Sequence, residues 1–87
     1  MNFTESILKH IDKLVGTLKS EDELQEVLKR KFTKKEYKVF VAFEEGKSME
    51  EVIEITRNDQ ERVEKIYETA CKKLNQELFK KELTSFN

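Results

Sequence analysis

The scarcity of turn residues is the feature that most constrains this chain: it has no proline and only two glycines in 87 residues. Hairpins and β-sandwiches need such residues at close intervals, so their scarcity favours helices. A Ser, Thr or Asn followed three residues later by Glu marks a helix start, because each side chain can cap a free backbone amide. The spacing occurs in five pairs: Asn2 and Glu5, Ser20 and Glu23, Thr33 and Glu36, Ser48 and Glu51, and Asn58 and Glu61. The sequence therefore predicts an all-α fold.

Apolar residues recur three or four positions apart within each segment that these pairs open. The first stripe, from Phe3 to Leu18, predicts a helix that ends near residues 16–19. Shorter helices are expected after Ser20, Thr33 and Ser48, the second of them ending at Gly46 as a left-handed cap. The last and longest helix carries an apolar stripe formed by Val63, Ile66, Tyr67, Ala70, Leu74 and Leu78. Phe79, Leu83 and Phe86 either extend this helix or fold back on it. We expect a small helical domain of four to five helices.

Length and composition exclude several classes of protein. The length points to one domain, residues 1–87, with little room for an enclosed substrate pocket, so we do not expect an enzyme. One cysteine, Cys71, and one histidine, His10, cannot build a disulfide framework or a zinc site, and no metal or cofactor is expected. Cys71 is interpreted as a packing residue and His10 as exposed. The short apolar runs and the absence of a leader pattern predict a cytoplasmic protein that does not span a membrane.

Charge is divided unevenly along the chain, although the net charge is only −1. Residues 29–38 hold six positive side chains and one negative, whereas residues 44–54 hold five negative side chains and one positive. Binding that depends on phosphate neutralisation usually needs an excess of Lys and Arg. Any contact with nucleic acid is therefore expected to be local.

Three groups of residues between positions 32 and 74 follow one known pattern. The first is Thr33, Lys34, Lys35, Glu36 and Val39; the second is Gly46, Ser48, Met49, Glu50, Glu51 and Val52; the third is Glu61, Arg62, Val63, Ile66, Ala70, Lys72, Lys73 and Leu74. Together they resemble the fourth conserved region of the bacterial sigma factors, which reads the upstream promoter element, and the related LuxR-type output domain. The resemblance implies a helix-turn-helix at 32–78, and we assign the flanking residues to N-terminal helices at 1–31 and a C-terminal tail at 79–87.

By this resemblance the protein is a transcription regulator that binds double-stranded DNA with its last long helix in the major groove. The resemblance assigns base reading to Gln60, Glu61, Arg62 and Lys65. It assigns phosphate contacts to Lys34, Lys35, Lys38, Arg57, Lys72 and Lys73. Because it covers only this region, it implies action as a dimer or as an adaptor on RNA polymerase or another protein.

Two features leave an alternative open. Ile53, Thr56 and Asn58 depart from the family pattern at the turn, and Ile53, which replaces a small residue, is expected to push the two helices apart. Glu64 stands where the family has Arg. The alternative is a protein–protein interaction module that keeps the scaffold without binding DNA. It would use the acidic stretch 44–54 and the acidic face of the recognition helix against a basic partner. In either case the surplus apolar residues of the first helix and the tail predict a homodimer.

Overall fold

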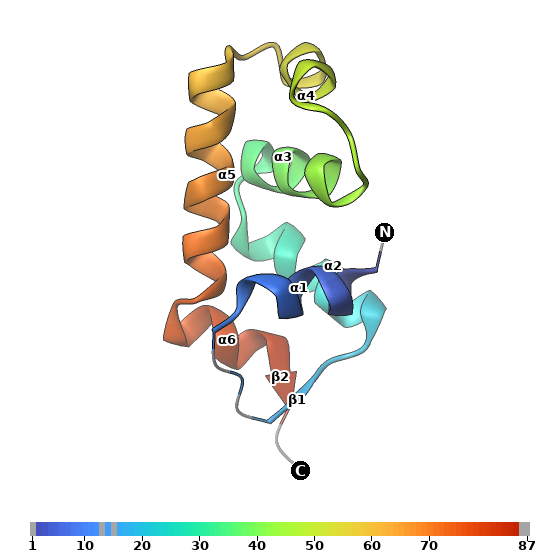
Figure 1. Ribbon diagram of the computed structural model, residues 1–87. Coiled ribbons are helices and arrows are strands. Elements are labelled where there is room, and N and C mark those ends of the chain that lie inside the picture. The colour runs from blue at the N-terminus through green and yellow to red at the C-terminus, as the bar shows by residue number, and fades with distance from the viewer. Residues whose placement is uncertain (1, 13, 15, 86–87) are drawn as a thin grey trace.

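The computed structural model describes residues 2–12, 14 and 16–85 of the chain. Within these residues there are six helices and one small antiparallel sheet (Figure 1). The elements are α1 (Phe3–His10), β1 (Thr17–Leu18), α2 (Glu21–Lys31), α3 (Lys34–Glu44), α4 (Met49–Thr56), α5 (Gln60–Leu74), α6 (Glu77–Leu83) and β2 (Thr84–Ser85). The predicted all-α fold is confirmed in that the domain is mostly helical, but the small sheet was not predicted and the described helices number six rather than four to five. None of them is long and apolar enough to cross a bilayer.

Helix starts follow the capping pattern closely. Full capping boxes open α2, α3 and α4 at Ser20, Thr33 and Ser48, as predicted. The start of the long helix is a correction, because its N-cap is Asp59 rather than Asn58. Asp59 Oδ1 accepts from the backbone amide of Arg62 at 2.8 Å, whereas the Asn58 amide donates to the Thr56 carbonyl at 3.2 Å. The negative charge of an aspartate at this position also interacts favourably with the positive end of the helix dipole.

The first helix is shorter than its apolar stripe predicts, since α1 ends at His10. Asn75, at the end of α5, donates from Nδ2 to the His10 carbonyl at 2.7 Å and accepts from the Asp12 amide at 3.0 Å. A partner far along the chain thus satisfies a carbonyl at the helix end. The following chain leads into β1, where Leu18 pairs with Thr84 of β2. Val15, which was assigned to the stripe, lies outside the described residues.

The C-terminal segment folds back instead of extending α5. Helix α5 ends at Leu74, and the separate helix α6 places Phe79 and Leu83 in the core at 4 % and 0 % exposure. Leu78 does not share that face and is 75 % exposed, which corrects its assignment to the buried stripe. Phe86 lies outside the described residues.

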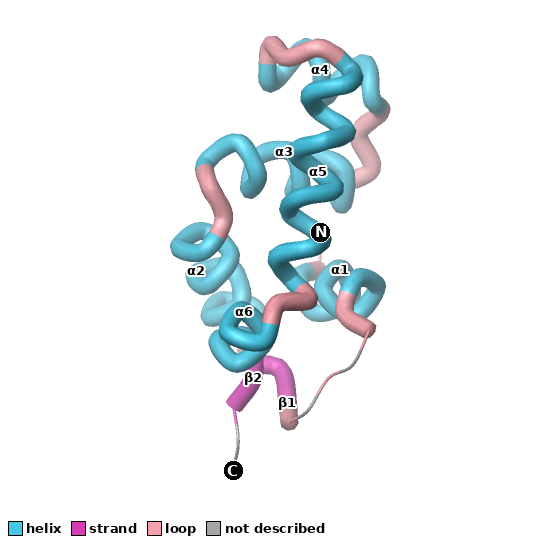
Figure 2. The backbone as a smooth tube through the Cα atoms, turned by 90° about the vertical axis from the view of Figure 1, so that its left-hand side faces the viewer, coloured by secondary structure: helices cyan, strands magenta, loops and turns pink. Residues whose placement is uncertain are grey.

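The buried residues form two clusters along an elongated molecule of 43 × 21 × 20 Å. Helix α5 runs past both, and α1 and α2 lie on one side of it in Figure 1; the view of Figure 2 separates them to its right and left. The large cluster contains Ile7, Leu24, Val27, Leu28, Phe32, Phe40, Ala70, Leu74, Phe79 and Leu83. The small cluster contains Val39, Ala42, Val52, Val63 and Ile66. Tyr67 packs against both and joins them.

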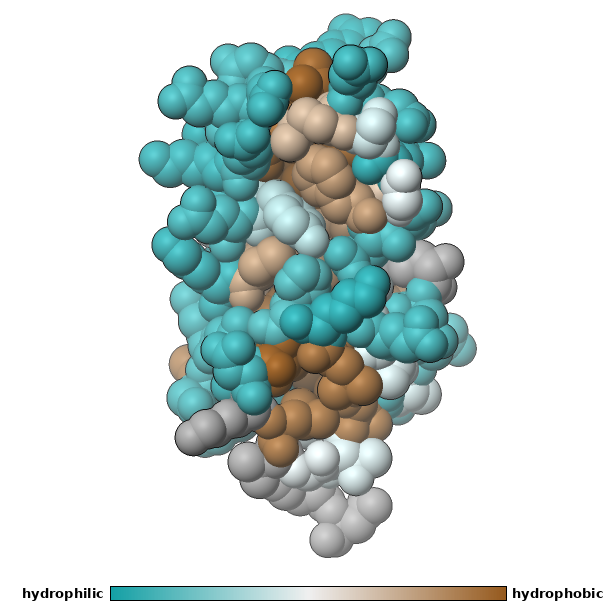
Figure 3. Space-filling model, in the orientation of Figure 1, coloured by the Kyte–Doolittle hydropathy of each residue, from teal (hydrophilic) through white to brown (hydrophobic). Residues whose placement is uncertain are grey.

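This packing changes the basis of the homodimer prediction. Ile7 of α1 and Phe79 and Leu83 of α6 were counted as surplus apolar residues, and all three lie in the large cluster of one chain. Apolar side chains remain at the surface, including Leu8 at 50 % exposure, and Figure 3 shows such residues gathered over the α1 end of the molecule and again beside α4 and α5. The homodimer stays a prediction that no contact in the structure tests.

Candidate nucleic-acid interface

Helices α4 and α5 are joined by a turn of three residues, 57–59. Arg57 adopts the left-handed conformation with φ 57°, and its amide donates to the Ile53 carbonyl at 2.8 Å, which ends α4. The side chain of Ile53 packs half-buried against the small cluster, whose members Val52 and Val63 come from the two helices. Both helices are therefore anchored through this cluster, and α5 runs from the α4 end of the molecule to α6 (Figure 1).

The four side chains predicted to read bases are all exposed on the first two turns of α5: Gln60, Glu61, Arg62 and Lys65. The opposite face of the helix is buried in the two clusters. This division follows from the helical period, because successive residues advance by about 100° and apolar residues three or four apart share one face. Gln60 Nε2 donates to Glu64 Oε1 at 3.0 Å, so these two side chains support each other on the outer face.

A shallow groove of about 290 Å³ lies between the start of α3 and the middle of α5. We call it the basic groove, and its lining residues are Thr33, Lys35, Glu36, Arg62, Lys65, Ile66 and Thr69. It brings Arg62 and Lys65 of the predicted base-reading set together with Lys35 of the predicted phosphate-contacting set. Three cationic side chains from two helices therefore share one surface.

The carboxylate in the basic groove is already neutralised by an ion pair. Glu36 Oε1 lies 2.6 Å from Lys73 Nζ, and it also accepts from the Thr33 amide at 2.9 Å. Burial acts to raise the pKa of Glu36, but the hydrogen bonds from Lys73 and Thr33 outweigh it and lower that pKa. Lys73, which is predicted to contact phosphate, forms an ion pair with this buried carboxylate. The positive charge that faces solvent is that of Lys35, Arg62 and Lys65.

The opposite flank of α5 carries the acidic side chains. Glu64 and Glu68 line a groove of about 340 Å³ together with Phe43, Met49 and Tyr67, which we call the acidic groove. Glu68 is also paired one turn further along, with its Oε1 2.9 Å from Lys72 Nζ. Arg62 and Lys65 therefore line the basic groove and Glu64 and Glu68 line the acidic groove, while the exposed Glu61 lies one turn from Lys65 and lines neither.

The remaining predicted phosphate contacts are dispersed. Lys34 and Lys38 line a different groove, on the side of α3 that faces α2 and α4. Arg57 is exposed at the turn between α4 and α5. Of the ten side chains that the resemblance assigns to DNA, three line the basic groove, Lys34 and Lys38 share another groove, and the other five line none of the described grooves.

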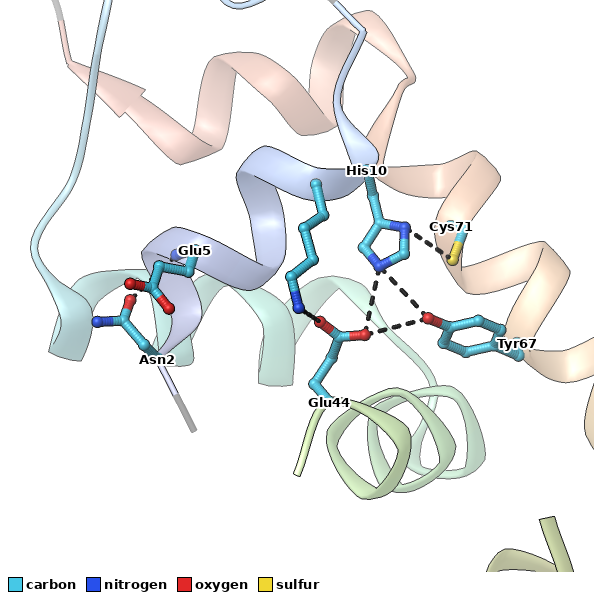
Figure 4. A network of polar contacts seen from close by, with 7 residues as sticks. Asn2, Glu5, His10, Glu44, Tyr67 and Cys71 are labelled. Carbon is cyan, nitrogen blue, oxygen red and sulfur yellow. Dashed lines mark hydrogen bonds and ion pairs between the residues drawn. The ribbon is translucent and has the colours of Figure 1, made fainter. Parts of the chain in front are cut away.

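Sequence reasoning missed a polar network at the junction of the two clusters (Figure 4). His10 is not exposed as expected, because only 20 % of its side chain is accessible. Its Nε2 lies 3.3 Å from Glu44 Oε2 and 3.3 Å from the Tyr67 hydroxyl, and its Nδ1 lies 3.6 Å from Cys71 Sγ. The Tyr67 hydroxyl donates to Glu44 Oε2 at 3.1 Å. These four residues connect α1, α3 and α5. Their contacts could not be predicted from the sequence because the residues lie far apart along the chain.

This polar network holds the three helices together and has no activated nucleophile. Burial raises the pKa of the Cys71 thiol, which keeps it in the protonated form rather than the nucleophilic thiolate. Burial also acts to raise the pKa of Glu44, but the polar groups around it, Ser6, His10 and Tyr67, lower that pKa overall. The carboxylate of Glu44 is thus held ionised between three helices. Within the described residues, no group of three or more His, Cys, Asp or Glu side chains is placed to hold a metal ion.

The chain matches no protein-family model, no curated protein and no solved structure. The resemblance to the fourth region of the sigma factors therefore stays a prediction, and the functional argument depends on the geometry of the surface.

Proposed function

We propose that this protein is a transcription regulator that binds double-stranded DNA through a helix-turn-helix formed by α4, the turn at 57–59 and α5. In this proposal the first two turns of α5 enter the major groove, as the second helix of such a motif does. The exposed residues offer suitable chemistry: Gln60 can pair with adenine, Arg62 or Lys65 with guanine, and Glu61 can accept from the cytosine amino group.

The observation that carries the proposal is that three cationic side chains from α3 and α5 line one groove. A chain with a net charge of −1 can bind a polyanion only where its positive side chains gather locally. Lys35, Arg62 and Lys65 gather at the basic groove, whereas Glu64 and Glu68 line the other flank. We assign phosphate contact to Lys35, because it lies on α3 beside the reading helix, and we assign Arg62 and Lys65 to the edge of the major groove.

One experiment tests this proposal directly: fluorescence anisotropy of labelled mixed-sequence duplex DNA at low and moderate salt, with the parent protein and with Arg62→Ala and Lys65→Ala. We expect binding that weakens as salt rises, and weaker binding in both variants. Lys81→Ala is the matched control, because it removes one positive charge from an exposed position on α6, away from the basic groove. Equal losses in all three variants, or no binding at low salt, would contradict the proposal.

The acidic groove favours a second candidate, a protein–protein interaction module that does not bind DNA. Glu64 and Glu68 next to the rings of Phe43 and Tyr67 offer carboxylates and aromatic faces to a basic partner. Glu44, which was expected to contribute to such a surface, cannot do so because only 6 % of its side chain is exposed. Absence of DNA binding at low salt would turn the search to partners of this kind.

A further inference from the structure

A further groove lies away from α5. Its volume is about 520 Å³, and it is formed by the end of α2, one face of α3, the loop before α4 and the last turn of α4. Its floor is apolar and includes Tyr37, Val41 and Ile55. Ile55 is 42 % exposed there, although an aliphatic side chain gains free energy when it is removed from water. We call this surface the lysine-rimmed groove.

The rim of the groove is strongly positive. Four lysines line it, Lys29, Lys34, Lys38 and Lys47, against a single acidic side chain, Glu45. The ion pairs found in the described part of the chain engage none of these four lysines. The surface therefore combines an apolar floor with an unneutralised cationic border.

We propose that the lysine-rimmed groove binds an acidic amphipathic helix of a partner protein. The complementary segment presents aliphatic side chains three and four residues apart to the floor and carries Asp and Glu along its edges to meet the lysines. Lys34, Lys38, Val41 and Glu45 lie at successive positions along one face of α3, so the groove follows the length of that helix, about 16 Å at 1.5 Å per residue. That length accommodates about three turns of a partner helix.

Two other occupants fit the surface less well. A nucleic-acid backbone would satisfy the lysines but leave the apolar floor uncovered, since phosphate contacts are made by charged and polar groups. A small amphiphile would be poorly covered in a groove open along its length, whereas small-molecule sites enclose most of the ligand surface. A helix laid along α3 covers the floor and meets both sides of the rim.

The lysine-rimmed groove and the basic groove lie on different faces of α3, and no residue of α5 lines the former. A partner helix can therefore occupy it while α5 stays accessible. This inference does not depend on the proposed function, because its surface and its probe are separate from those of DNA binding.

The test uses a fluorescein-labelled peptide with the repeat Leu-Glu-Glu-Leu, which places leucines three and four residues apart. Anisotropy is measured with the 87-residue protein. Two control peptides replace every Glu by Lys or alternate Leu and Glu so that no apolar helical face forms. We expect binding of the first peptide and at least about tenfold weaker binding of each control, as loss of two or three rim contacts or of the apolar contact would give.

Variants of the protein locate the binding. Ile55→Ser removes an exposed floor residue without changing charge, and the double variant Lys34→Glu with Lys38→Glu reverses charge at the rim. Each is expected to weaken the binding of the acidic peptide about tenfold, while Lys81→Glu, on α6, has no effect. Equal binding of the acidic and basic peptides, or equal losses in Lys81→Glu and the rim variant, would overturn the proposal. Circular dichroism of each variant verifies that the helices are retained.

Discussion

The two ends of the molecule are built differently. The large cluster has ten buried residues, and Phe32 connects two of its aromatic rings, with centroid distances of 5.5 Å to Phe40 and 5.3 Å to Phe79. Polar ties between distant segments close this end: the Glu21 carboxylate accepts from the Thr4 amide at 2.7 Å, and Arg30 pairs with Glu82 at 2.9 Å. The small cluster has five buried residues and joins only α3, α4 and α5.

This difference separates the residues that stabilise the fold from those that line the candidate binding grooves. The lysine-rimmed, basic and acidic grooves are all lined by residues of α3, α4 or α5, with Lys29 of α2 at one margin. The large cluster supports the end of the molecule that carries none of these three grooves. We therefore expect mutations in the large cluster to lower global stability and mutations in the small cluster to loosen the binding surfaces first.

The largest effect is expected for Phe40→Ala in the large cluster. Phe40 is fully buried and its ring lies 5.6 Å from that of His10 and 6.2 Å from that of Tyr67. Removing such a ring should lower the free energy of unfolding by about 3–5 kcal/mol. Urea denaturation followed by circular dichroism measures the loss. A loss under about 1 kcal/mol would mean that this end is not the stabilising one.

A smaller and more local effect is expected for Val52→Ala in the small cluster. Val52 is fully buried and anchors α4 against α5. The loss of two methyl groups should cost about 2 kcal/mol. In amide hydrogen exchange, α4 should lose more protection than α2, because local opening precedes global unfolding. Uniform loss of protection across all helices would show that the two clusters unfold as one unit.

The polar network around Glu44 predicts that the free energy of unfolding depends on pH. Because the pKa of Glu44 is lowered in the folded protein from its ordinary value of 4.5, the unfolded chain binds a proton more readily. The stability that Glu44 contributes is therefore present above pH 4.5 and is lost as the pH falls through the lower, folded pKa. Urea denaturation across this range should show a smaller acid loss for Glu44→Gln than for the parent. Glu45→Gln, at the exposed neighbouring position, is the control, and an acid loss in Glu44→Gln as steep as that of the parent would contradict the assignment.

The smallest effect is expected at the turn between α4 and α5. Arg57 is the one non-glycine residue with positive φ among those described. Arg57→Gly should relieve this conformation and raise the free energy of unfolding by about 0.5–1 kcal/mol. Thermal unfolding measures the change, with Arg30→Gly inside α2 as a contrast that should destabilise the protein. Destabilisation by Arg57→Gly would show that the arginine side chain supports the turn.

The features that sequence predicted correctly are local ones. Ser20, Thr33 and Ser48 cap helices through residues three positions away, and Gly46 takes the left-handed conformation after α3, with φ 90°. The end of α1 could not be predicted in this way, because Asn75 satisfies the His10 carbonyl from 65 residues along the chain. The local apolar stripe simply continues past that point.

The candidate surfaces were predictable only in part. The exposure of Gln60, Arg62 and Lys65 follows from the helical period of α5. The division of the lysines does not, since Lys34 and Lys35 are neighbours in sequence but line different grooves. Which groove each lysine joins depends on where α2, α4 and α5 pack around α3, and this information is not local to the segment.

That pair of neighbours gives the most direct test of the central claim, which is that DNA binds at the basic groove beside α5. The salt dependence of DNA affinity is measured for Lys34→Ala and Lys35→Ala, which remove the same charge from adjacent positions. We predict weaker binding and a salt slope smaller by about 0.9 for Lys35→Ala, the value expected for one lost phosphate contact, with the parent slope retained in Lys34→Ala. Equal changes in the two variants, or a change in Lys34→Ala alone, would contradict the account.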